Sequence, residues 1–298
     1  IRPVNMLQDS IAKLLFRLSL PTTTGMIVYS LFSLIDTFFV AKLGALPFAA
    51  LTLVIPLQIL IISVSSATGT GLTSLIGRTL GSGDVQLADN VAWHGIVISF
   101  VYAGLAIGLG LHYIDSLLIL FGCTPETFAL SKEYMYIILW GSLFTFLPMT
   151  LGNIIQGEGN TFLPMVISLL GISLNVLFDP IFIFGWGGIP ALGLNGAAIA
   201  TVLSQVVITV VIVALVKGKK AQLTWSWASF RPSLGVVKEI YRVGFPAMVM
   251  EMVAVFNLAI INRTLTGYSY TAVAALGIFM RIRSLAYMPV HGLAQGTM

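Results

Sequence analysis

The chain alternates between long apolar stretches and short polar segments. Eight apolar stretches each come near the ~20 residues that a helix needs to cross a bilayer. They are Leu18–Val40, Leu51–Ile76, Val91–Leu111, Tyr134–Ile155, Phe162–Phe184, Gly196–Val216, Phe245–Leu265 and Ala272–Ala294. Because hydrocarbon offers no partner to backbone N–H and C=O groups, stretches of this length must be helices, whereas barrel strands would be shorter and would alternate. The pattern predicts an all-α polytopic membrane protein with lipid around it.

The composition agrees with this fold class. Hydrophobic residues make up 57% of the chain and charged residues 9%, which lies far outside the range of soluble globular proteins. No charged segment with a short apolar stretch and a cleavage site precedes the first span, so we expect no signal peptide. The single cysteine, Cys123, falls in a predicted loop and excludes an intrachain disulfide.

The net charge of +4 could suggest nucleic acid as a partner, but the distribution of the charge predicts a membrane orientation instead. With a cytoplasmic N-terminus, the inner segments carry the greater share of basic residues. These are Arg2, Lys13, Arg17, Arg78, Lys217, Lys219, Lys220, Arg231, Lys238 and Arg242, against Lys42, Lys132 and Arg263 outside. We therefore expect no nucleic-acid partner and a multi-pass protein of the inner (plasma) membrane with its N-terminus in the cytoplasm.

A basic segment with interfacial tryptophans, residues 217–242, predicts a cytoplasmic linker between two lobes. Residues 1–216 would form a six-helix lobe, and residues 243–298 the first two helices of a second lobe. An offset of 225 residues brings Lys13, Arg17 and Pro21 onto Lys238, Arg242 and Pro246, which favours an internal repeat. We expect two six-helix lobes and twelve spans in all, so the chain would stop within its second repeat.

Three carboxylates fall inside predicted spans, where ionisable groups are costly and usually functional. Asp36 shares one helical face with Tyr29 and Ser33, and Asp179 lies one turn after Asn175 and directly before Pro180. Glu251 lies early in the seventh span. Each acid could instead make structural hydrogen bonds, and Glu251 could reach the headgroups. Arg281 and Arg283 are either counter-ions of these acids or signs of a shifted helix boundary.

The spans supply few other polar groups, so we expect a large, apolar and adaptable substrate cavity. Candidate substrate-binding residues lie on helices expected to border a central cleft. They are Tyr29, Phe32, Tyr136, Met149, Asn153, Gln156, Met248, Glu251 and Met280, although such residues more often simply pack or face lipid. His94, His112 and His291 lack metal-ligand spacing, and we find no phosphate loop, no GxSxG and no HExxH. We expect no metal site, no cofactor and no enzyme activity.

Several motifs follow one another along the chain. The first is LFSLIDTFFVAKLG, residues 31–44, followed by Ala49-Ala50-Leu51. GNIIQGEGNTFLP at residues 152–164, NVLFDPIFIF at 175–184 and GLNGAAIATVLSQ at 193–205 come next, and the last stretch spans residues 275–295. Together they resemble the multidrug and toxic compound extrusion (MATE) family, and residues 275–295 resemble the eighth helix of its bacterial multidrug branch. The resemblance covers nearly the whole chain.

The resemblance implies a monomeric secondary transporter that exports organic cations and drugs in exchange for H⁺ or Na⁺ by alternating access. Asp36, Asn175 and Asp179 match the family's cation-coupling network. Ala197 or Thr201 occupies the fourth position, and only Thr201 could supply an oxygen. A flippase for lipid-linked intermediates and, less favoured, a membrane-embedded enzyme are the alternatives. The sequence leaves open the coupling ion, its stoichiometry and the range of drugs.

Overall fold

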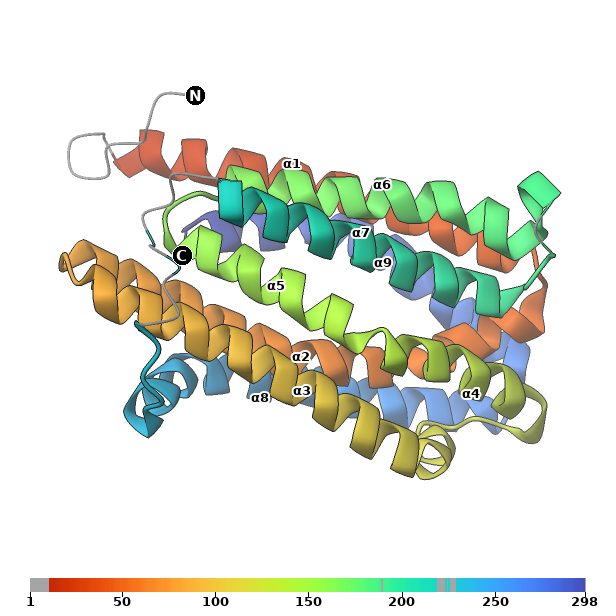
Figure 1. The fold of residues 1–298 in the computed structure, drawn as a ribbon. Coiled ribbons are helices and arrows are strands. Elements are labelled where there is room, and N and C mark those ends of the chain that lie inside the picture. The colour runs from red at the N-terminus through yellow and green to blue at the C-terminus, as the bar shows by residue number, and fades with distance from the viewer. Residues whose placement is uncertain (1–10, 189, 219–222, 224, 226–228, 298) are drawn as a thin grey trace.

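The computed structural model describes residues 11–188, 190–218, 223, 225 and 229–297, and it is helical throughout its regular elements (Figure 1). The longest helices are α1 (Ile11–Ala41), α2 (Ala45–Gly81), α3 (Val85–Leu120), α8 (Leu234–Thr266) and α9 (Tyr270–Thr297). The shorter ones are α4 (Pro125–Trp140), α5 (Ser142–Gly157), α6 (Phe162–Phe184), the 3₁₀ turn η1 (Trp186–Gly188) and α7 (Leu194–Gly218). The prediction of an all-α membrane protein is confirmed.

Several connections between helices are short because local sequence signals end one helix and start the next. The Asp84 carboxylate caps α3 by accepting from the Leu87 N–H at 2.9 Å. Helix α4 starts with Pro125 behind a capping box formed by Thr124 and Thr127. Gly185 ends α6 at φ 78°, a left-handed conformation that a glycine adopts at little cost.

Six helices in the described part of the chain are long and apolar enough to cross a membrane, namely α1, α2, α3, α6, α7 and α8. The bent pair α4 and α5 makes a seventh span if the two helices are counted together. The eighth predicted span, Ala272–Ala294, lies in α9, which is not among these helices. The count of eight spans is therefore not confirmed.

The predicted span Tyr134–Ile155 was expected to be one helix, and the structure corrects this. Helices α4 and α5 meet at Gly141 with a bend of 51°. A Cβ atom at Gly141 would overlap the Val202 side chain of α7, so the glycine permits a close approach of the two segments. The bend thus sits where α7 packs against the junction of α4 and α5.

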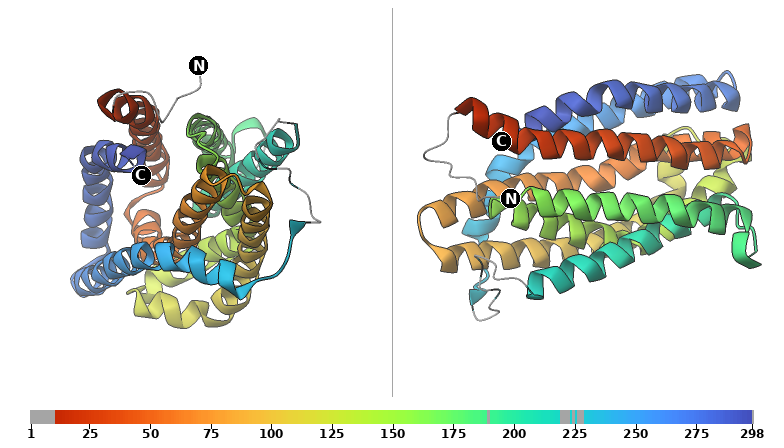
Figure 2. Two further views of the ribbon diagram at one scale, coloured as in Figure 1. Left: turned by 90° about the vertical axis from the view of Figure 1, so that its left-hand side faces the viewer. Right: turned by 90° about the horizontal axis from the view of Figure 1, so that it is seen from above.

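The helices form an elongated bundle in which α8 packs along α2 and α9 packs along α1 (Figure 2). The helices of the predicted second lobe therefore contact the first two helices of the predicted first lobe. Two apolar clusters fill the bundle, one around the start of α2 with α4 and the other around the end of α2 with α5 and α7. Within the predicted linker 217–242, α7 extends to Gly218 and α8 begins at Leu234.

Candidate functional site

The predicted cation-coupling residues come from α1, α6 and α7, and α6 packs against both of the other helices. Asp179 of α6 is fully buried. Its Oδ1 accepts a hydrogen bond from Asn175 Nδ2 at 3.4 Å, one turn earlier on the same helix. The same Asn175 nitrogen donates to Thr201 Oγ1 of α7, also at 3.4 Å. The geometry therefore brings Asn175, Asp179 and Thr201 together across two helices.

Asp36 of α1 completes the cluster from the other side. Its half-buried carboxyl group lies close enough to Asp179 for the two side chains to interact directly. Two carboxylates so close repel each other when both are ionised, and each attracts a cation. Within the described residues, Asp179 Oδ2 is buried and receives no hydrogen bond. An unpaired buried oxygen beside a second carboxyl group has the chemistry of a site for a proton or a small cation.

Of the two candidates for the fourth position, Thr201 is the one whose side-chain oxygen contacts Asn175. Its hydroxyl donates to the Ala197 carbonyl at 2.9 Å and accepts from Asn175, while the Ala197 side chain is buried and apolar. The two alternatives, Ala197 and Thr201, lie one turn apart on α7, and only the second contributes a polar side chain to the cluster.

Sequence reasoning missed two polar residues next to this cluster, Tyr134 of α4 and Gln58 of α2. Tyr134 is almost completely buried and its hydroxyl accepts from Gln58 Nε2 at 3.1 Å. The Tyr134 hydroxyl lies within electrostatic reach of Asp36, Asp179 and Arg281. A glutamine in the middle of an apolar span was the signal that could have identified this pair.

The substrate-binding candidates are distributed over α1, α4, α5, α8 and α9. Tyr136 of α4 is exposed, and Lys132 Nζ lies 5.8 Å from the centre of its ring. Asn153 of α5 donates to the Met149 carbonyl at 2.8 Å, and its own carbonyl accepts from Thr73 of α2 at 2.9 Å. These contacts give Asn153 and Met149 local roles in the packing of α5 against α2.

The other candidates occupy α1, α5, α8 and α9. Phe32, Gln156, Met248 and Met280 are half-buried. Glu251 of α8 accepts a hydrogen bond from Ser66 of α2 at 3.0 Å, which places its carboxylate at the contact between the predicted lobes. Tyr29 lies on α1, but its side chain and that of Ser33 fall outside the described residues.

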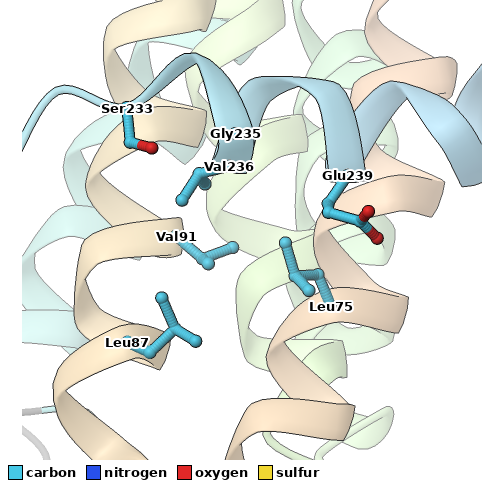
Figure 3. Close-up of a pocket in the computed structure, with 7 residues that line it drawn as sticks. All are labelled: Leu75, Leu87, Val91, Ser233, Gly235, Val236 and Glu239. Atoms are coloured by element: carbon cyan, nitrogen blue, oxygen red, sulfur yellow. The ribbon is translucent and has the colours of Figure 1, made fainter.

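A small pocket of about 250 Å³ lies between α2, α3 and α8 (Figure 3). Apolar side chains form most of its wall, and Ser233 and Glu239 supply the polar atoms. Its lining residues are Leu75, Leu87, Val91, Ser233, Gly235, Val236 and Glu239. None of the predicted substrate-binding residues lines this pocket, so its place in the described structure does not correspond to the expected cavity.

Comparisons with known proteins agree with the resemblance. The MatE family model matches residues 21–181. A protein of Shewanella oneidensis named "FAD transporter" is 28% identical over 98% of this chain and 65% of its own length. The "Multidrug export protein MepA" of Staphylococcus saprophyticus is 25% identical over 97% of this chain and 63% of its own length. The chain thus spans just under two thirds of these relatives.

Solved structures give the same result at the level of the fold. A multidrug resistance MATE family transporter of the MOP superfamily in an outward-facing conformation aligns with a TM-score of 0.86 at 32% identity, over 99% of this chain and 65% of that one. An inward-facing conformation aligns with a TM-score of 0.83 at 31% identity, over 90% of this chain and 60% of that one. The proteins named in these matches are transporters, in agreement with the prediction that this chain is not an enzyme.

Proposed function

Because the chain belongs to the MatE family, we propose that the protein is a secondary active exporter that exchanges organic cations, including drugs, for H⁺ or Na⁺. Export proceeds by alternating access between two lobes. The relatives named for multidrug export support the substrate class. We further propose that the exporter is a monomer in the inner (plasma) membrane, with the N-terminus in the cytoplasm.

The cluster of Asp36 and Asp179 with Asn175 and Thr201 is the observation that carries this proposal. When the carboxyl groups are ionised, they attract either a small coupling cation or an organic cation. When a proton or Na⁺ neutralises them, that attraction is lost. Coupling ion and substrate therefore compete for the same negative charge, which is the physical requirement for exchange.

The energy available for export depends on the charges exchanged. If one H⁺ enters for each monovalent organic cation that leaves, the membrane potential contributes nothing, because no net charge moves. A tenfold concentration ratio of the organic cation then requires about 1.4 kcal/mol from the chemical gradient of the coupling ion. Exchange of more than one coupling ion per substrate would make export respond to the potential as well.

Ethidium efflux from proteoliposomes tests the proposal. The protein is reconstituted, and a pH gradient or a Na⁺ gradient is imposed separately. We expect one of the two gradients to drive efflux and Asp36→Asn to abolish it, since the amide keeps the shape of the side chain without its charge. Efflux by Asp36→Asn at the wild-type rate, at equal protein content in the vesicles, would remove Asp36 from the coupling site.

Export of a flavin nucleotide is a second candidate function, favoured by the Shewanella relative named "FAD transporter". Such a substrate is anionic, and Arg281 of α9 would supply positive charge to bind it. Accumulation of FAD in inverted vesicles under the same gradients distinguishes the two functions. An exporter of organic cations would move ethidium and leave FAD behind, and a flavin exporter would do the reverse.

A further inference from the structure

Arg281 of α9 lies within electrostatic reach of the Asp36 carboxyl group on α1. The two helices pack side by side along much of their length (Figure 2). One turn beyond Arg281, the Ser284 hydroxyl lies 3.3 Å from the Ser30 hydroxyl of α1. Residues three apart share a helical face, so the face of α9 that carries Arg281 and Ser284 is the face that meets α1.

Arg283 lies only two residues further on, and its setting is different. Two residues correspond to about 200° around a helix, so Arg283 occupies the opposite side of α9. It is exposed, and its guanidinium lies 5.9 Å from the centre of the Tyr287 ring. The neighbouring arginines therefore separate into one that faces the acid cluster and one that does not.

The charges around Asp36 explain why a cation is needed at this place. Asp36 and Asp179 interact with each other, and no other basic residue acts on Asp36 among the interactions that the described structure defines. A guanidinium beside two carboxyl groups offsets their mutual repulsion and stabilises the ionised form. Removing one partner of such a pair from an apolar surrounding leaves an uncompensated charge, which is costly.

We propose that Arg281 is a tethered counter-ion of Asp36, which a transported cation must displace, so that cation binding at Asp36 loosens the contact between α1 and α9. The inference rests on the proposed exchange of cations. It gives Arg281 a positioning and regulatory role, because Arg281 acts on the ion through Asp36. A ligand can shift a conformational equilibrium only through interactions that differ between the two states, and loss of the Asp36–Arg281 attraction is such a difference.

The arrangement links ion binding to the relative position of the lobes. Asp36 belongs to the predicted first lobe and Arg281 to the predicted second lobe. Without a bound cation, the attraction between them favours the packed arrangement of α1 and α9. With a cation at Asp36, the attraction is weakened and α9 is free to separate. The same pair also makes the site selective, because a cation must compete with Arg281 to enter.

Binding of tetraphenylphosphonium to the purified protein tests the competition. We expect Arg281→Gln to bind this cation about tenfold more tightly, within the range typical of coupled sites, because the competing charge is gone. Arg281→Lys keeps a positive charge and should bind like the wild type. Arg283→Gln is the matched control and should leave the affinity unchanged. Equal or weaker binding by Arg281→Gln would overturn the inference.

The spacing between α1 and α9 provides a readout that does not depend on Arg281→Gln being well folded. Spin labels at the exposed residues Phe38 and Ile278, in a protein with Cys123→Ser, report this spacing by electron paramagnetic resonance. Saturating tetraphenylphosphonium should lengthen the distance in the background that keeps Arg281. An unchanged distance distribution, with the cation shown to be bound, contradicts the inference.

The outcomes separate this inference from the proposed function. If the wild type exports ethidium while Arg281→Gln and the wild type bind tetraphenylphosphonium equally, the exporter function stands and the role of Arg281 falls. If neither the wild type nor Arg281→Gln binds tetraphenylphosphonium, both are overturned. Tighter binding by Arg281→Gln, together with wild-type affinity in Arg281→Lys, supports the tethered counter-ion. If Arg281 were merely structural, its replacement by glutamine would weaken binding.

Discussion

Asn175 holds the acid cluster together through its single amide nitrogen. This nitrogen lies 3.4 Å from Asp179 Oδ1 on α6 and 3.4 Å from Thr201 Oγ1 on α7. The amide can donate to both oxygens but cannot neutralise a carboxylate. The charge of the site therefore depends on Asp36, Asp179 and whatever cation lies between them. Thr201 is neutral, so its contribution should appear in affinity and not in the charge exchanged.

Thr201→Ala should weaken binding of the coupling cation by about fivefold, which corresponds to loss of about 1 kcal/mol for one polar contact. The cation concentration that gives half-maximal ethidium efflux measures this change. Thr201→Ser keeps the oxygen and should restore the wild-type value. Thr209→Ala is the control, because Thr209 lies two turns further along α7 and its hydroxyl donates to the backbone carbonyls of Gln205 and of Phe144 on α5. An equal loss in the control would mean that the effect arises from α7 packing.

Glu251→Gln should change substrate range while leaving the fold intact. Ser66 can still donate to the oxygen of the new amide, so the contact between α2 and α8 is kept and only the charge is lost. Efflux of a divalent organic cation should fall more than efflux of monovalent ethidium, because Asp36 and Asp179 remain for the first charge. Glu239→Gln, an exposed acid near Arg242 on the same helix, is the control. An unchanged ratio of the two rates would make Glu251 structural.

Contacts within one helix were predictable at the residue scale, and contacts between helices were not. The spacing of four between Asn175 and Asp179 fixes a shared helical face, and the structure shows their hydrogen bond. The Gln58–Tyr134 bond joins residues 76 positions apart, and its existence depends on how α2 packs against α4. The sequence also could not decide between a counter-ion role and a shifted helix boundary for Arg281, since that requires the position of α9 against α1.

At the scale of helices, the contact between α2 and α8 depends on glycines. A Cβ atom at Gly244 of α8 would overlap the Ala67 carbonyl of α2, and one at Gly71 of α2 would overlap the Ile240 carbonyl of α8. The two backbones therefore approach as closely as small residues allow, as is common between membrane helices. Polar side chains lie beside this crossing, where Thr68 and Tyr241 share a hydrogen bond of 2.9 Å.

Gly244→Val should separate α2 from α8 and lower the free energy of unfolding by about 1–3 kcal/mol, the usual cost of an overpacked contact. The thermal midpoint of the purified protein in detergent measures the loss. Gly108→Val on α3 adds the same side chain where nothing lies within 4 Å, so it should cost far less. Equal midpoints for the two variants would show that the close crossing contributes no stability.

The linker is attached to α3 by backbone N–H groups, which no periodicity in the sequence indicates. Ser233 donates to His94 Nε2 at 3.0 Å, and Arg231 donates to Asn90 Oδ1 at 3.0 Å. His94 Nδ1 lies 2.8 Å from the Asn90 carbonyl, so both ring nitrogens have partners. These contacts give His94 a structural role, and its partners could be identified only from the folded chain.

At the scale of the whole molecule, the connections between helices lie at two opposite ends of the bundle (Figure 1). The α2–α3 connection lies at the same end as the start of α8, and the α1–α2 and α3–α4 connections lie at the other. Arg78, Arg231, Lys238 and Arg242 belong to the first end, and Lys42, Lys132 and Arg263 to the second. Asp115 forms a salt bridge of 2.6 Å with Lys132, and its negative charge offsets that of the lysine at the second end.

Basic segments near a membrane favour the cytoplasmic side, where each Lys or Arg gains about 1 kcal/mol from anionic lipids. We therefore expect the α2–α3 connection to be cytoplasmic. Cysteines introduced by Ser82→Cys and Lys42→Cys, in a Cys123→Ser background, mark the two ends. A membrane-impermeant maleimide should label position 42 in intact cells and position 82 only after permeabilisation.

The direction of exchange is set by the gradient of the coupling ion, so the labelling tests the orientation of the chain alone. The reverse labelling pattern would place Arg78 and the linker outside the cell and contradict the expected orientation. The native Cys123 serves as an internal comparison in the unsubstituted protein. Burial raises the pKa of its thiol, although contacts with Ser131 and Thr127 oppose the effect, so its thiolate fraction at neutral pH is low. Cys123 should therefore react more slowly than the cysteine at position 42, although the two lie at the same end. Equal rates would contradict the burial of the α3–α4 loop around Cys123.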